Sequence, residues 1–151
     1  MDPNIAISEI MTHNLVTVVP HDSLAKVNTI FLEYNFHHIP VVDKGNRLVG
    51  MITKEDLLRL TSVRPEFSEK AFDKIVVKDI MTSNLVTLEA EDTVGLAADI
   101  FLANEFHAIP VLEEERLTGI ITTYDLIKYA YKTPFNAPME EGQFSLDEMN
   151  P

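Results

Sequence analysis

Two copies of one short motif carry the residues of this sequence that are best suited to chemistry. They are Gly50-x-x-Thr53-x-x-Asp56 and Gly119-x-x-Thr122-x-x-Asp125. A carboxylate can accept both hydroxyls of a ribose diol, and a threonine hydroxyl beside free N–H groups at a helix N-terminus suits phosphate oxygens. The same spacing is also typical of a capping box, in which Thr and Asp only complete the start of a helix. Spacing alone does not decide between these two interpretations.

The motif belongs to a longer internal repeat. The octapeptide at 10–17, Ile-Met-Thr-His-Asn-Leu-Val-Thr, recurs at 80–87 as Ile-Met-Thr-Ser-Asn-Leu-Val-Thr. With one residue deleted opposite Asn46, 55 positions align and 24 pairs are identical. A unit of this size buries too little surface to be comfortably stable alone. We therefore expect the two copies to pack face to face about a pseudo-twofold axis, with any cleft between them lined twice by matching groups.

The elements that must position these residues follow from local patterns. A β-rich run at 15–19 precedes a helix that Asp22 or Ser23 can cap. The predicted buried faces of this helix and of its counterpart in the second copy are Leu24, Val27, Phe31 and Tyr34, and Val94, Ala97, Ala98 and Phe101. Two strands, 39–42 and 47–53, are joined by a turn at 43–46, and a second helix covers 54–60. The predicted fold is therefore α/β of the α+β type, with a β-α-β-β-α repeat occurring twice.

Composition and charge separate the predicted units and exclude several classes of function. We expect a first repeat at 5–60, a linker at 61–74, a second repeat at 75–130 and a flexible acidic tail at 134–151. The chain has 12 Lys and Arg against 24 Asp and Glu, a net charge of −12, which argues against nucleic-acid binding. The first repeat has five basic and six acidic residues, whereas 75–129 has three and ten. The second half therefore carries most of the excess negative charge.

Other site types find little support. There is no cysteine, no apolar run of membrane-spanning length and no signal-peptide pattern, so we expect a cytoplasmic protein without membrane insertion. His37 and His38 are adjacent, would face opposite sides of a strand and lack a third metal ligand. The three glutamates at 113–115 fit a solvated hairpin tip. No nucleophile–base arrangement or Walker-type loop stands out, so we predict no catalytic residues, no metal site and no enzyme.

The Ile-Met-Thr, Ile-Pro-Val and Gly-x-Ile-Thr-x-x-Asp-Leu segments, present in both copies and in the same order, resemble a cystathionine β-synthase-type (CBS) domain. The pair resembles a stand-alone Bateman module, and the resemblance covers about residues 5–130. It implies an adenine-nucleotide signature whose Asp holds the ribose and whose Thr approaches the phosphate. It also implies crossed sites. One combines Thr122 and Asp125 with Val16, Thr17, His37, His38, Ile39 and Pro40; the other combines Thr53 and Asp56 with Val86, Thr87, His107, Ala108, Ile109 and Pro110.

The two implied sites are expected to differ. Lys54 could meet a polyphosphate beside Thr53, whereas Thr123 occupies the equivalent position. Because the chain is acidic, we expect a triphosphate to need Mg²⁺ or to bind more weakly than AMP. The predicted ligand is AMP, ADP or ATP, and no cofactor is required.

The predicted role is regulatory. We expect ligand binding to be passed to a separate effector protein or to the chain's own homodimer, since 151 residues leave no room for an effector domain. Two alternatives stay open. One is an interaction or dimerisation module with empty ligand sites, and the other is a sensor of S-adenosylmethionine or a divalent cation.

Overall fold

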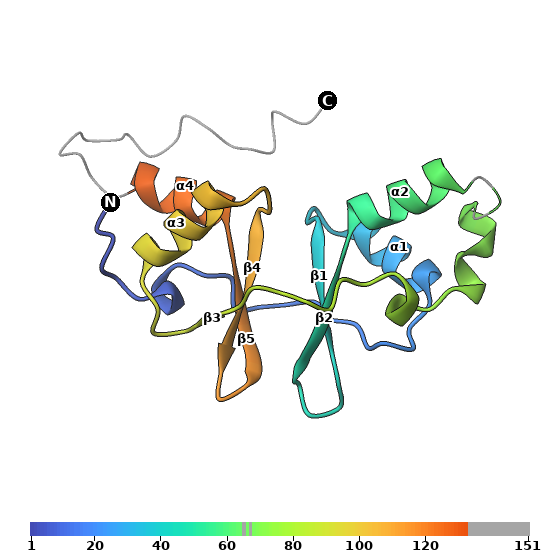
Figure 1. The fold of residues 1–151 in the computed structure, drawn as a ribbon, viewed down its shortest axis with the longest axis horizontal. Helices are drawn as coiled ribbons and strands as arrows, with labels where there is room; N and C mark the ends of the chain where they lie inside the picture. The colour runs from blue at the N-terminus through green and yellow to red at the C-terminus, as the bar shows by residue number, and fades with distance from the viewer. Residues whose placement is uncertain (65, 67, 133–151) are drawn as a thin grey trace.

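The molecule consists of two similar halves, each built on an antiparallel hairpin. The computed structural model describes residues 1–64, 66 and 68–132, and the predicted acidic tail lies outside them. The first hairpin pairs β1 (His38–Val42) with β2 (Leu48–Thr53), and the second pairs β4 (Ala108–Glu113) with β5 (Arg116–Thr122). The two hairpins stand side by side with the helices on their outer flanks, and the two halves are related by an approximate twofold (Figure 1). The predicted α+β fold with two related repeats is confirmed.

The first helix of each repeat starts at a hydroxyl cap. In α1 (Leu24–Glu33) Ser23 accepts a hydrogen bond from the Lys26 N–H, and in α3 (Val94–Ala103) Thr93 accepts one from the Leu96 N–H. The buried side chains are Leu24, Val27 and Phe31 in α1, and Val94, Ala97 and Phe101 in α3. The predicted faces are thus confirmed except at two positions. Tyr34 follows the end of α1 and is 48% exposed, and Ala98 is only half-buried.

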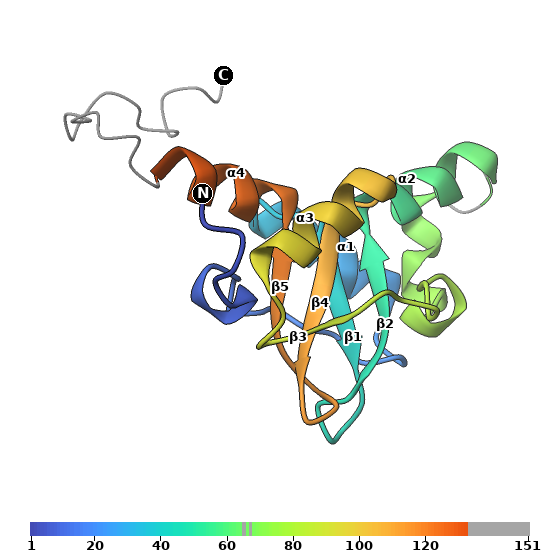
Figure 2. The same ribbon diagram turned by 60° about the vertical axis from the view of Figure 1, so that its left-hand side comes forward.

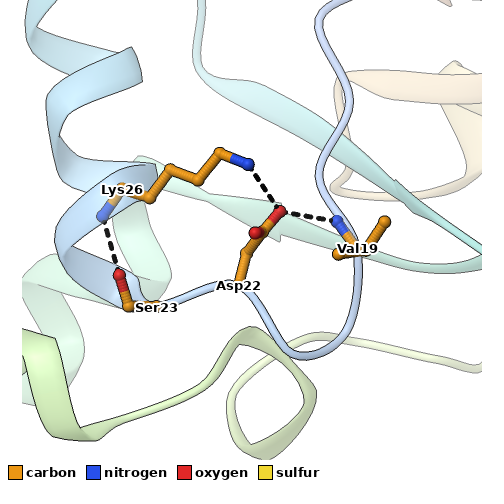
Figure 3. Close-up of polar contacts among 4 residues, drawn as sticks. All are labelled: Val19, Asp22, Ser23 and Lys26. Atoms are coloured by element: carbon orange, nitrogen blue, oxygen red, sulfur yellow. Dashed lines mark hydrogen bonds and ion pairs between the residues drawn. The ribbon is translucent and has the colours of Figure 1, made fainter.

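A carboxylate fixes the entry into α1. Asp22 Oδ2 accepts a hydrogen bond from the Val19 N–H at 2.9 Å and forms an ion pair with Lys26 Nζ at 3.0 Å (Figure 3). Asp92 repeats the first of these contacts in the second half, where it accepts from the Glu89 N–H at 2.8 Å. The Asp common to both copies therefore closes the turn that leads into the helix.

The strand before each first helix is shorter than predicted. In the second repeat β3 (Leu88–Glu89) pairs in parallel with β4, and in the first repeat a single bridge joins Val18 to Val41. The predicted run at 15–19 thus contributes one residue to the sheet. The hairpin turns differ too: Glu114 and Glu115 have φ values of 49° and 65°, while Asn46 has 60°.

The two repeats exchange their N-terminal segments. The short 3₁₀ helix η1 (Ile7–Glu9) lies on the second half, where the Ile7 N–H donates to the Asp92 carbonyl at 2.8 Å. The matching η3 (Val77–Asp79) lies on the first half, where the Val77 N–H donates to the Asp22 carbonyl at 2.9 Å. Ile7 is fully buried in the core of the second half and Val77 in the core of the first. Each core therefore needs residues from both repeats.

The second helices complete each half. They are α2 (Lys54–Val63) and α4 (Thr123–Lys132), and a further 3₁₀ segment, η2 (Glu69–Lys74), follows α2. Helix α2 continues to Val63, into the stretch predicted as linker. Helices α1 and α2 flank the first hairpin and α3 and α4 flank the second (Figure 1), and the turned view shows the hairpin turns pointing away from the helices (Figure 2).

Candidate functional site

Both copies of the Thr-x-x-Asp motif form capping boxes. The Thr53 N–H donates to Asp56 Oδ2 at 2.8 Å and the Asp56 N–H donates to Thr53 Oγ1 at 3.1 Å. The same two bonds join Thr122 and Asp125, at 2.8 and 3.1 Å. The capping interpretation is therefore confirmed in both repeats. These bonds occupy Oδ2 of each aspartate and leave the ligand interpretation open.

The motif glycines make room for the other repeat's exchanged segment. A Cβ on Gly50 would lie 2.6 Å from Met81 Sδ, and one on Gly119 would lie 2.5 Å from Met11 Sδ. Next to Gly50, Met51 exchanges two backbone hydrogen bonds of 2.9 Å with Thr82. Only a residue without a side chain permits this approach, so the glycines carry a packing role of their own.

A pocket of about 220 Å³ lies beside Thr53, between the two repeats. We call it the inter-repeat pocket. From the first repeat it is lined by His38, Met51 and Thr53; from the second repeat it is lined by Thr82, Asn84, Leu85, Val86, Phe106, Ala108 and Pro110. Asp56, bonded to Thr53, lines an adjacent larger pocket that shares Thr82. The pocket wall is mainly apolar, and its polar groups are His38 and Thr53 from the first repeat and Thr82 and Asn84 from the second.

His38 is the titratable group whose environment in this pocket is most distinctive. Burial lowers the pKa of its imidazole below the ordinary value, and the charges of His37 and His107 lower it further. The charges of Asp56 and Glu55 oppose that shift. The ring is thus neutral at pH 7 and can both donate and accept a hydrogen bond.

The structure brings together part of the predicted crossed site. Thr53, Val86, Ala108 and Pro110 line one pocket as grouped, and Asp56 is joined to it through Thr53. His38, which was grouped with Thr122 and Asp125, lines this same pocket and is paired with Thr53 in the β1–β2 register. Five lining residues were not predicted: Met51, Thr82, Asn84, Leu85 and Phe106. Four of these belong to repeated segments, at 80–87 and 106–111, whose recurrence could have indicated them.

Other predicted contacts lie elsewhere or have a restricted role. Ile39 and Ile109 are fully buried in the two cores, so only their main-chain atoms could meet a ligand. The Lys54 ammonium lies 5.9 Å from the centre of the Phe31 ring, and Lys54 lines neither pocket described above. The remaining ones stay predictions: Val16, Thr17, His37, Pro40, Thr87 and His107, together with Thr122 and Asp125 as a second site.

The described residues contain neither a metal-binding cluster nor a membrane-spanning helix. Within 1–64, 66 and 68–132, no group of three or more His, Cys, Asp or Glu side chains is placed to hold a metal ion. No helix in the same ranges is long and apolar enough to cross a membrane.

Comparison with known proteins identifies the repeat. The CBS domain family model matches residues 7–62 and again residues 77–132. The chain belongs to the CBS domain family. The first CBS match begins at η1 and ends in α2, and the second begins at η3 and ends in α4. The two matches therefore correspond to the two sequence repeats.

Similar solved structures share the CBS pair architecture. A conserved protein from Pyrococcus horikoshii is 28% identical with a TM-score of 0.77, over 91% of this chain and 100% of that one. CBSX2, solved in complex with AMP, is 26% identical with a TM-score of 0.74, over 85% of this chain and 97% of that one.

Curated relatives are mostly much longer. The chain is 34% identical to an inosine-5'-monophosphate dehydrogenase of Bifidobacterium longum over 75% of its own length but 20% of the enzyme's. It is 28% identical to protein MJ1404 of Methanocaldococcus jannaschii, over 82% of its own length and 31% of that protein. The chain thus spans less than a third of these relatives, which match through its CBS pair.

Proposed function

We propose that this CBS pair is a regulatory module that binds an adenine nucleotide (AMP, ADP or ATP) in the inter-repeat pocket. One observation carries the proposal: Thr53 of one repeat lines a single pocket with Val86, Ala108 and Pro110 of the other, and Asp56 is hydrogen-bonded to Thr53 at its edge. A ligand there would contact both repeats at once. The complex of CBSX2 with AMP supports an adenine nucleotide as the ligand class.

The chemistry of the pocket suits a nucleoside. Asp56 uses Oδ2 for the cap, and its carboxylate can accept ribose hydroxyls with its remaining lone pairs. Pro110 and Val86 offer flat apolar surface to a base, and Asn84 offers an amide for its polar edge. The neutral imidazole of His38 can hydrogen-bond either a hydroxyl or a phosphate oxygen.

Binding would act by shifting the relative placement of the repeats. A ligand can change a conformational equilibrium only by its differential affinity for the two states. A molecule that bridges β2 and the segment at 82–86 contacts both walls of the pocket only when the two repeats are close together. It therefore has a higher affinity for the closed arrangement than for the open one. We propose that this change is read by a separate effector protein or by self-association, without catalysis by the chain itself.

The helix layer supports a homodimer as one form of readout. Exposed apolar side chains occur on all four helices, including Leu32, Leu58, Leu102 and Ile127. Leu32 and Leu102 are equivalent in the repeat, as are Leu58 and Ile127. Exposed apolar residues that recur in both repeats suit a twofold contact with a second copy of the same chain.

A second candidate ligand is S-adenosylmethionine, which shares the adenosine group. A CBS pair of protein MJ0100 has been solved with S-adenosyl-L-methionine and 5'-methylthioadenosine, but at 22% identity it supports the fold alone. A thermal-shift series with AMP, ADP, ATP and S-adenosylmethionine, with and without Mg²⁺, separates these ligands, because only a ligand of the folded state raises the melting temperature with its concentration.

The decisive experiment separates the cap of Asp56 from its ligand role. In Asp56→Asn the side-chain carbonyl can still accept the Thr53 N–H, whereas the charge that favours ribose hydroxyls is lost. We expect Asp56→Asn to keep nearly all stability but to bind AMP about 10- to 100-fold more weakly by calorimetry, as for the loss of one or two charged hydrogen bonds. Asp56→Ala should lose the affinity and also about 1 kcal/mol of stability.

Asp125→Asn is the matched control at the second motif. It should leave the affinity of the inter-repeat pocket unchanged, and any second binding event that it removes reports a site at Thr122. If both Asp56 variants bind AMP like the wild type, or if the wild type binds none of the nucleotides, the motif is only a cap and the interaction-module alternative stands.

A further inference from the structure

A second pocket adjoins the inter-repeat pocket, between α2 and the segment that enters the first half from the linker. We call it the linker pocket. It measures about 670 Å³ and is lined by Asp56, Arg59, Leu60, Val63, Arg64, Lys74, Ile75, Asp79, Ile80 and Thr82. Its walls are the outer turns of α2 on one side and residues 74–82 on the other.

Cations converge on this pocket from both walls. Arg59 and Arg64 come from α2 and its C-terminal end, and Lys74 comes from the opposite segment. Three positive groups face two carboxylates, Asp56 and Asp79, within a chain whose net charge is −12. Like charges around one cavity repel, and an anion between them would relieve that repulsion. Arginine also matches the geometry of phosphate oxygens.

The corresponding place in the second half does not carry this charge on both walls. By the repeat alignment Lys128 replaces Arg59 and Lys132 replaces Val63, so α4 has cations, but Asn4 replaces Lys74 and no cation stands on the opposite wall, at 4–12. Tyr129 stands where Leu60 stands and its hydroxyl lies 3.5 Å from the Asp2 carbonyl oxygen, so α4 is tied to the N-terminal segment. The cation cluster therefore distinguishes one repeat from the other and is not a property of the shared fold.

We propose that the linker pocket binds a multivalent phosphate anion, with Arg59 and Lys74 as its principal ligands. The anion can be a separate phosphorylated molecule or the phosphate chain of a nucleotide in the inter-repeat pocket. The phosphate chain of a nucleotide in the inter-repeat pocket could reach the linker pocket because the two pockets adjoin. Thr82 lines both of them, and the Thr53–Asp56 hydrogen bond joins a residue of one to a residue of the other. This anion site does not require that the inter-repeat pocket bind adenine nucleotides at all.

Coupling between the pockets follows from their common wall. The segment at 74–82 lines the linker pocket and continues, through Thr82, into the wall of the inter-repeat pocket. An anion that bridges Arg59 and Lys74 would fix this segment against α2. Occupancy of one pocket would then change affinity at the other, reciprocally.

The test is calorimetric titration of the full chain with inorganic triphosphate, without Mg²⁺ and at fixed ionic strength. We expect binding to the wild type and at least a 10-fold loss in Arg59→Gln/Lys74→Gln. Lys128→Gln/Lys132→Gln is the control, because it removes the same charge from α4 and should bind within about twofold of the wild type. All four side chains are exposed, so melting curves should match the wild type. No binding to the wild type, or equal loss in both double variants, overturns the proposal.

Further titrations distinguish the two sources and the two proposals. If adenosine and triphosphate bind together while ATP competes with triphosphate, the pocket receives the phosphate chain of the nucleotide. If ATP and triphosphate bind together, the pocket takes a separate phosphorylated molecule. If triphosphate binds but adenosine does not, the anion site in the linker pocket is supported and the proposed nucleotide binding is contradicted.

Discussion

At the scale of single residues, the capping bonds of each motif aspartate could be predicted from spacing alone, whereas its proposed contact with a ligand could not. The Thr-x-x-Asp spacing predicted the cap, and four backbone hydrogen bonds confirm it. Spacing does not specify which residues share a pocket with Thr53, because two of them, Val86 and Pro110, lie 33 and 57 positions further along the chain. The glycine of the motif illustrates the same limit: its partner Met81 is seen only in the fold.

Strand alternation sets another limit at this scale. His38 and Pro40 share one face of β1, and Ile39 faces the core with none of its surface exposed. The family resemblance grouped these neighbours in one site, whereas the pleat divides them. A prediction that applies the period of two to each implied contact would have kept His38 and set aside the side chain of Ile39.

His38 gives the protein a pH dependence with a definite sign. Its folded pKa is lowered by burial first and by His37 and His107 next, with Asp56 and Glu55 opposing. An unfolded chain with an ordinary histidine pKa then binds the proton more readily than the folded chain. The stability that neutral His38 allows is therefore complete above about pH 6.5 and is lost as the pH falls toward the lowered pKa.

We therefore expect the melting temperature to fall more between pH 7.5 and 5.5 in the wild type than in His38→Ala, which installs the alanine found at the equivalent position of the second repeat. His21→Ala, at an exposed histidine outside the pocket, should follow the wild-type curve. Parallel curves for wild type and His38→Ala would contradict the assignment.

At the scale of elements, local patterns predicted the helices and hairpins well, but they predicted the ends of helices and the short first strand of each repeat poorly. The faces of α1 and α3 follow from their apolar spacing, and the turn after Val42 follows from its composition. The strand at 15–19 shrinks to one bridge because its pairing depends on a parallel neighbour more than 20 residues away. Tyr34 continues the helical spacing but lies beyond the helix end, where it stacks on Phe36.

The exposed apolar residues on α2 and α4 predict a homodimer that charged substitutions at these positions would dissociate. Leu58 and Ile127 are 65% and 66% exposed at equivalent positions of α2 and α4. We expect light scattering to give twice the chain mass of 17.1 kDa for the wild type and a monomer for Leu58→Glu/Ile127→Glu, because charges at both positions would be buried without partners.

Val19→Glu is the control for this experiment, since Val19 is 41% exposed but lies outside the helices. It should stay dimeric. A monomeric wild type, or a double variant that stays dimeric, would contradict dimerisation through this surface. The proposed signal would then have to pass to an effector protein.

At the scale of the whole molecule, the exchange of N-terminal segments makes the two repeats interdependent. Repeat length predicted that the copies would pack together, but their sequences could not predict the exchange. Ile7 and Val77 are apolar residues at equivalent positions, so neither sequence indicates which of the two cores its residue joins. The core that each residue joins is determined by the path of the chain between the halves, which places η1 on one side and η3 on the other (Figure 1).

Interdependence predicts that damage to the N-terminus destabilises both halves. Ile7 is fully buried among Met11, Leu88 and Ala97 of the second core, so Ile7→Ala leaves a cavity there. We expect a loss of about 2–5 kcal/mol, with a fall in melting temperature on the order of 10 °C. Glu9→Ala, in the same segment but exposed, should be nearly neutral.

Methyl NMR during urea unfolding reports the two cores separately, through Ile39 in the first and Ile109 in the second. In Ile7→Ala both signals should disappear in one coincident transition at lower urea, although the cavity lies in the second core alone, because segment 1–12 crosses from the first repeat and η3 crosses back. A variant in which Ile109 unfolds while Ile39 keeps its wild-type midpoint would show that each half is stable alone and that the exchange carries no coupling between them.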